Sequence, residues 1–225
     1  MPRKLSKGHN APSGSIATLA AYSSSPSVLT DDRPLPRLFV FDLDYTLWPF
    51  WVDTHVTPPL KALATSSHTA ATDRFGDTFA FYPDVPSVLH TLPQAGVSMA
   101  LASRTTTPDL AKDLLKLLHI IPPPAQTEGS DGGDEGSKPK RDKPRRAVDG
   151  FEGGMEIYPG SKIRHMEALS KRTGVPYHEI LFFDDESRNF EVESLGVTMC
   201  LVRDGVNWTE IERGVKEWRR RREIE

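Results

Sequence analysis

The stretch "FVFDLDYTLWPFW", residues 39–51, joins a short apolar run to two closely spaced acids. The run from Leu38 to Phe41 is continuously apolar, which is typical of a strand that is buried on both faces of a parallel sheet. Asp42 and Asp44 follow at once, and side chains two positions apart in an extended chain point the same way. The sequence therefore predicts that a buried strand directs two carboxylates at one place.

Further apolar runs alternate with stretches of helical periodicity. The predicted strands are residues 38–41, 97–102, 180–183 and 197–202. Leucines spaced by four residues from Leu110 to Leu118 mark one helix, and a second is expected between Ser161 and Gly174. A third helix is expected from about Asn207. This alternation predicts an α/β fold with a doubly wound parallel sheet, in which ligands bind beyond the carboxyl ends of the strands.

The chain has 225 residues, which suits one domain with attachments. Residues 1–35 are rich in Ser, Ala and Pro, and residues 122–150 carry almost no apolar side chains. We therefore expect a disordered tail and a disordered insertion, with residues 36–225 forming the domain. The basic run "KPKRDKPRR", residues 138–146, is interpreted as a charged linker rather than a nuclear-localisation or nucleic-acid patch, and residues 219–222 as the exposed end of a helix.

The composition limits which compartment and which classes of binding partner suit the protein. The single cysteine, Cys200, excludes an internal disulfide and suits a reducing compartment. A net charge of −3 does not indicate nucleic acid, and no apolar run approaches the ~18 residues of a membrane span. We expect a monomer in the cytoplasm, with the nucleus as an additional location, that binds neither nucleic acid nor membrane.

Polar side chains follow three of the predicted strands at the point where each ends. They are Asp42 and Asp44, then Ser103 and Arg104, then Asp184, Asp185, Glu186 and Asn189. Carboxylates brought together at one edge of a sheet would repel one another or become protonated unless a cation neutralises them. Oxygen ligands without His or Cys favour Mg²⁺. The alternative is that these acids merely terminate strands, which readily explains one such cluster and explains two clusters and a Ser-Arg pair less well.

Lys162 is expected in the first turn of its helix, where the helix dipole disfavours a cation by ~0.3–1 kcal/mol. A bound anion would reverse this penalty, and the alternative is that the side chain points into water. Together with Arg104 and a cation site, Lys162 would form half of a phosphate clamp. Such a site suits phosphoryl transfer, in which positioning and charge neutralisation supply most of the catalysis.

The strings "FDLDYT", "ASRT", "PGSK" and "FFDDESRN" resemble, in this order, the four motifs of the haloacid dehalogenase (HAD) superfamily. Longer strings around them are similar to the magnesium-dependent phosphatase 1 family, over residues 37–121 and 152–215. The resemblance implies a phosphatase that hydrolyses phosphate monoesters through an aspartyl-phosphate intermediate. Its substrates would be aryl phosphates such as phosphotyrosine, or sugar phosphates on glycated amines or proteins, and the sequence does not choose between them.

The resemblance also implies catalytic roles. Asp42 would be the nucleophile, and Asp44 would protonate the leaving oxygen and then activate water. Ser103 and Arg104 would bind the phosphoryl group. Lys162 would hold the same group and orient Asp42.

For the metal, the resemblance implies Mg²⁺ bound by Asp42, by the main-chain carbonyl of Asp44 and by Asp185. Asp184 and Asn189 would contact these ligands without binding the metal themselves. The assignment of the direct ligand between Asp184 and Asp185 is left open.

Residues 48–82 stand where many relatives carry a cap domain, and we expect a short hairpin flap there instead. Its two extended arms would be residues 51–56 and 78–82. Trp48 and Trp51 would either line the mouth of the site or pack the flap onto the body, and neither alternative is favoured. Without a cap domain the site should be open to bulky substrates.

Two other functions are compatible with some of these residues. A phosphoacceptor signalling module also gathers acids and a lysine around Mg²⁺, but its acidic pair precedes the acceptor, whereas Asp184 and Asp185 follow Asp42. A non-catalytic scaffold that binds partners through the basic insertion is the other alternative. Steady turnover of a phosphate ester would distinguish an enzyme from both.

Overall fold

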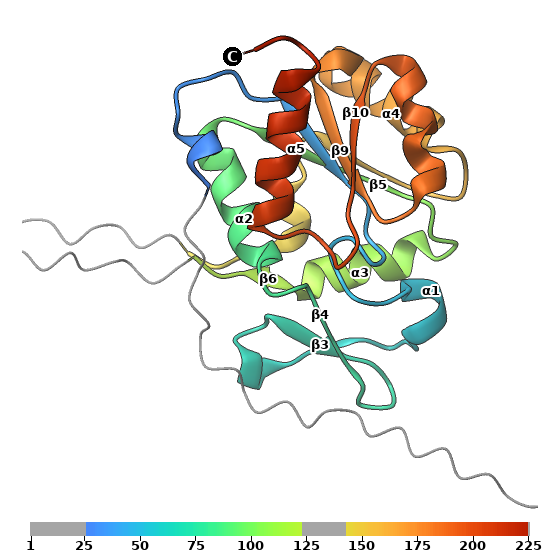
Figure 1. Cartoon of the computed structure of the whole chain (residues 1–225). Coiled ribbons are helices and arrows are strands. Elements are labelled where there is room, and N and C mark those ends of the chain that lie inside the picture. The colour runs from blue at the N-terminus through green and yellow to red at the C-terminus, as the bar shows by residue number, and fades with distance from the viewer. Residues whose placement is uncertain (1–25, 123–142, 225) are drawn as a thin grey trace, which may run out of the picture.

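The computed structural model describes residues 26–122 and 143–224. A five-stranded sheet in the order β10-β9-β1-β5-β8 forms its centre (Figure 1). The strands are β1 (Leu38–Phe41), β5 (Ser98–Ser103), β8 (Gly154–Ile157), β9 (Ile180–Asp184) and β10 (Thr198–Leu201). All neighbouring pairs are parallel, which confirms the predicted α/β class with a parallel sheet.

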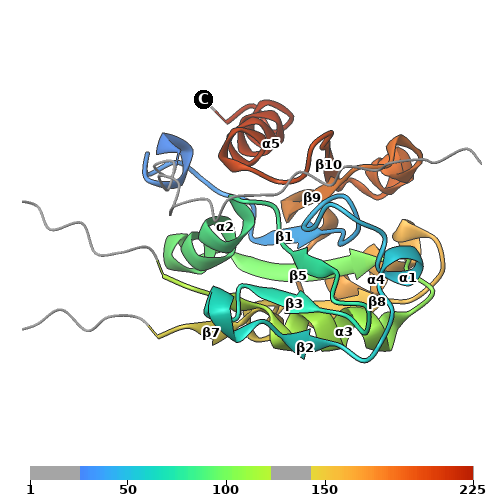
Figure 2. The ribbon, with the colours of Figure 1, turned by 90° about the horizontal axis from the view of Figure 1, so that it is seen from below.

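Helices cover both faces of this sheet. They are α2 (Val85–Thr91), α3 (Pro108–Leu117), α4 (Lys162–Thr173) and α5 (Trp208–Arg220). Phe39, Phe41 and Phe183 share one apolar cluster with α2, α3 and α5, whereas Val40 and Phe182 share another with α4. This division arises because successive strand residues point to opposite faces. Figure 2 shows β9, β1 and β5 side by side, which places β1 inside the sheet.

The flap consists of a short helix and a small separate sheet, and it lies below the strand ends in Figure 1. It contains α1 (Val52–His55) and the antiparallel strands β2 (Lys61–Ala62), β3 (Ala70–Thr72) and β4 (Thr78–Ala80). The expected extended arm at residues 78–82 is therefore present as β4. The arm expected at residues 51–56 is wrong, because most of it forms the short helix α1.

The predicted boundary of the N-terminal tail is also wrong. Val28 and Leu29 are buried in the larger apolar cluster, whereas residues 1–25 lie outside the described part of the chain. Arg219 is buried and donates hydrogen bonds to the main-chain oxygens of Val28 and Pro34, so it is not part of an exposed helix end as predicted. Tertiary contacts with α5 therefore order a segment whose composition indicated disorder.

The predicted insertion is likewise too long at its C-terminal end. Within residues 143–150, the strand β7 (Arg145–Arg146) pairs with β6 (His119–Ile120), and Ala147 is buried. Arg145 donates to the main-chain oxygen of Leu89 at 2.7 Å, so this part of the basic run is not a linker. The disorder predicted for residues 123–142 lies outside the described residues. Within the two described stretches, no helix is long and apolar enough to cross a membrane.

Candidate active site

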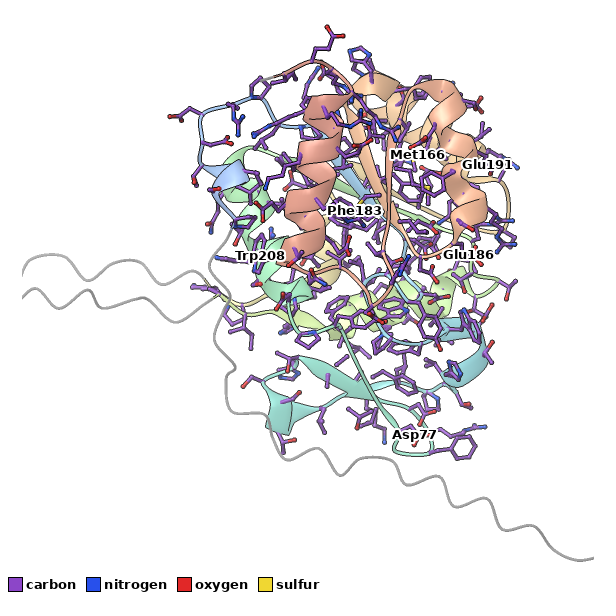
Figure 3. All side chains as sticks on the ribbon, in the orientation of Figure 1. Asp77, Met166, Phe183, Glu186, Glu191 and Trp208 are labelled. Carbon is purple, nitrogen blue, oxygen red and sulfur yellow. The ribbon has the colours of Figure 1, made fainter. Side chains whose placement is uncertain are left out.

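The carboxyl ends of three neighbouring strands bring the predicted site residues to one edge of the sheet. Asp42 directly follows the central strand β1, Ser103 ends β5, and Asp184 ends β9. A pocket of about 160 Å³ opens at this edge. Of the predicted residues, those lining it are Asp42, Asp44, Ser103, Arg104, Lys162 and Asp185. Glu186, labelled in Figure 3, lies at the same edge and also lines the pocket.

Lys162 is the buried cation of the site. Its side chain is 1% exposed, and its Nζ lies 2.6 Å from Asp42 Oδ1 and 3.1 Å from Asp184 Oδ2. It also donates to the main-chain oxygen of Ala102. Although burial opposes the shift, the two carboxylates raise the pKa of Lys162. The alternative that it points into water is therefore wrong. The three donors of the ammonium group all face protein acceptors, which matches the predicted role of orienting Asp42. The same contacts leave no donor directed at a phosphoryl group, so the other predicted role, holding that group, is not matched.

Asp184 and Asn189 lie behind the pocket and connect Lys162 to Arg104. Asp184 is fully buried and accepts hydrogen bonds from Asn189 Nδ2 at 2.8 and 2.9 Å. Asn189 Oδ1 in turn accepts from Arg104 Nη1 at 3.2 Å. Asp185 lines the pocket whereas Asp184 does not, which supports Asp185 as the direct metal ligand.

Asp44 is held by residues of the flap. Its Oδ1 accepts hydrogen bonds from Trp48 Nε1 at 2.7 Å and from the main-chain N–H of Val52 at 3.1 Å. The two tryptophans differ in their surroundings. Trp48 is fully buried and stacks on Phe50, whereas Trp51 is 51% exposed and lines the pocket. Each of the two alternatives left open by the sequence therefore applies to one of them.

Burial raises the pKa of three carboxyl groups that line the pocket, those of Asp42, Asp44 and Asp185. For Asp42 the shift is upward although Lys162 opposes it by favouring the ionised carboxylate, so its pKa lies above the usual range. Burial, with Asp184 beside it, raises the pKa of Asp185 to about 6. Burial also raises the pKa of Asp44 to about 6, despite its two hydrogen bonds. A bound cation would stabilise the ionised forms of these acids, because an opposite charge nearby favours the charged state.

Four further residues line the pocket without having been assigned a role from the sequence: Asp53, Thr105, Glu186 and Arg188. Thr105 belongs to the quoted string "ASRT", which could have suggested it. Asp53 accepts a hydrogen bond from Thr106 Oγ1 at 2.9 Å, and this bond ties α1 to the loop after β5. No sequence pattern indicates that contact, because it depends on how the flap folds back.

The fold is that of hydrolases of the HAD superfamily. The chain belongs to the Acid Phosphatase family, whose model matches residues 34–221. The predicted membership of a phosphatase family within this superfamily is thereby confirmed.

Relatives and solved structures agree with this assignment. Human magnesium-dependent phosphatase 1 is 42% identical over 183 residues, which are 81% of this chain and 86% of the relative. A HAD-like hydrolase superfamily protein of Schizosaccharomyces pombe is 40% identical and covers 72% of this chain and 83% of its own. A HAD-superfamily hydrolase from Ehrlichia chaffeensis superposes with a TM-score of 0.50 at 10% identity, covering 82% of this chain and 98% of that chain. This last likeness shows the fold.

Proposed function

We propose that this protein is a Mg²⁺-dependent phosphatase that hydrolyses phosphate monoesters by way of a phosphorylated Asp42. The observation that carries the proposal is the position of Asp42 at the end of the central strand. Its side chain lines the pocket together with Ser103 and Arg104, and its Oδ1 is held 2.6 Å from Lys162 Nζ. The names of the relatives support both the activity and the metal.

The donor set fits Mg²⁺. No group of three or more His, Cys, Asp or Glu side chains that could hold a metal ion is found among the described residues. Mg²⁺ does not need such a group, because it keeps several waters and binds through one or two carboxylates together with substrate phosphate. Asp42, Asp185 and the main-chain carbonyl of Asp44 would hold it. When bound, Mg²⁺ supplies positive charge that offsets the charge of these acids and of the phosphoryl group.

In the first half-reaction, Arg104 and the hydroxyls of Ser103 and Thr105 hold the phosphoryl group in line with Asp42. A carboxylate oxygen of Asp42 attacks phosphorus, the bond from phosphorus to the ester oxygen breaks, and Asp44 donates a proton to that oxygen. Lys162 keeps the Asp42 carboxylate oriented throughout. The products are the free alcohol or phenol and an aspartyl-phosphate.

In the second half-reaction, Asp44, now ionised, removes a proton from water as the water attacks the phosphorus of the aspartyl-phosphate. The acyl-phosphate bond breaks, inorganic phosphate leaves, and both carboxyl groups return to their initial states. One group thus serves as acid and then as base, which requires a single side chain that reaches both the leaving oxygen and the attacking water.

The substrate class proposed is aryl phosphates, such as phosphotyrosine, or sugar phosphates on glycated amines or proteins. The mouth of the pocket supports a planar or extended leaving group. Trp51 is half-exposed there, and its ring stacks against His55 with centroids 5.7 Å apart and meets Tyr45 edge-on at 5.0 Å.

The test is a phosphatase screen of the purified protein over aryl, sugar and peptide phosphates. Steady turnover is expected with Mg²⁺, loss of turnover after chelation, and recovery with Mg²⁺ but not with Ca²⁺, which prefers longer bonds and more ligands. A single stoichiometric phosphorylation without turnover would instead indicate a phosphoacceptor module. No reaction with any class of phosphate ester would contradict the proposal.

A further inference from the structure

We propose that Trp48 is a positioning residue for the phosphatase reaction, acting through Asp44. Its indole N–H fixes Asp44 so that Oδ2 alone exchanges protons with the leaving oxygen and with water. The inference rests on the proposed function, in which Asp44 is the acid and base. It assigns to the flap a part in catalysis besides covering the site.

The hydrogen bonds of Asp44 are unequally divided between its two oxygens. Oδ1 accepts from Trp48 Nε1 at 2.7 Å and from the Val52 N–H at 3.1 Å. No described residue donates to Oδ2. A protonated carboxyl group has one O–H, and a proton on Oδ1 would oppose two N–H donors that already point at it. The proton that Asp44 gives to the substrate is therefore carried on Oδ2.

The donors themselves cannot turn away. Trp48 is fully buried, its ring lies parallel to Phe50 with centroids 5.3 Å apart, and it stacks on Phe81 at 6.0 Å. Val52 is the first residue of α1, and the next residue, Asp53, is bonded to Thr106 of the body. Aromatic packing thus holds the N–H of Trp48 in place, and the hydrogen bond between Thr106 and Asp53 holds that of Val52.

Burial of an indole does not by itself dictate such a bond. The Nε1 of Trp208 is also buried and has no hydrogen-bond partner in the described residues, whereas that of Trp218 donates to a main-chain oxygen. At position 48 the partner is the side chain of the proposed acid. A phenylalanine could fill most of the same apolar space, so the N–H is the feature that packing alone does not require.

The test replaces the N–H while keeping the ring. Incorporation of benzothienylalanine at position 48 puts sulfur in place of the indole N–H, and Trp48→Phe serves as a second variant. Formation of phosphoenzyme is measured by rapid quench with an alkyl phosphate and with nitrophenyl phosphate. We expect the rate to fall by about tenfold or more with the alkyl ester and by less than about threefold with the aryl ester, since only an alkoxide needs its proton in the transition state.

The same replacement at Trp208 is the matched control, because the buried Nε1 of Trp208 has no hydrogen-bond partner in the described residues. It should leave the rates with both substrates within about twofold of wild type. The KM values of the position 48 variants should stay near that of the wild type. Equal losses for the two leaving groups in both variants would overturn the inference. Absence of phosphoenzyme in the wild type would instead contradict the proposed function.

Discussion

Replacing Arg219 with methionine should destabilise the folded protein by about 3 kcal/mol. Arg219 is 3% exposed, and its guanidinium donates to the main-chain oxygens of Pro34, Val28 and Arg33 at 2.9, 3.0 and 3.2 Å. Methionine keeps much of the apolar volume but leaves these acceptors without their donor, at about 1 kcal/mol for each bond. The contacts of Arg219 with Asp31, which reaches solvent, are not counted in this figure.

The assay is urea and thermal unfolding of the full chain. For a chain of 225 residues, about 3 kcal/mol corresponds to a decrease in Tm of roughly 6–12 °C. Arg220→Met is the control, because the side chain of Arg220 is 72% exposed and, among the residues that the structure describes, pairs with Glu217 alone. Its change in stability should therefore stay within about 0.5 kcal/mol. Equal stability of the Arg219 and Arg220 variants would refute the argument that Arg219 anchors the N-terminal segment.

Three other outcomes are expected. Asp44→Asn should slow phosphoenzyme formation far more with alkyl than with activated aryl phosphates, and with the aryl ester it should give a burst of phenolate followed by slow turnover, because the second step loses its base. Burial and the charge of Lys162 lower the pKa of His165 to about 4. Between about pH 6.5 and pH 4 the unfolded chain therefore binds a proton that the folded chain does not, and the free energy of unfolding should decline as the pH falls. His165→Gln should lose less stability over this interval in pH-dependent urea unfolding. A Gly/Ser linker in place of residues 123–142 should leave turnover of an aryl phosphate within about twofold of wild type, whereas extending it to residue 149 should lower Tm, because Ala147 is buried.

Much of the fold and site was predictable because local patterns carry the information. Continuous apolar runs marked four of the five strands of the central sheet, and parallel strands bring their carboxyl ends to the same edge. The polar residues following those runs therefore had to converge. The strand of the central sheet that was missed is β8, "GMEI", which contains a glycine and a charged residue and lies at the edge of that sheet.

The remainder depended on contacts between distant parts of the chain. Neither the direction of Lys162 nor the burial of Arg219 follows from its own neighbours, since each is fixed by acceptors far away in sequence. The different surroundings of Trp48 and Trp51 likewise arise from how the flap folds onto the body. Composition was misleading for residues 26–35, where a few buried apolar residues and one arginine order a polar segment.

The most direct test of the central claim is identification of the phosphorylated residue. Protein mixed with Mg²⁺ and a labelled phosphate monoester is quenched in acid within the first turnover and mapped by mass spectrometry. We predict a hydroxylamine-sensitive acyl phosphate on Asp42, longer-lived in Asp44→Asn and absent from Asp42→Asn, which should have lost several orders of magnitude in turnover while remaining folded. Turnover without a phosphorylated Asp42, or normal turnover by Asp42→Asn, would contradict the account.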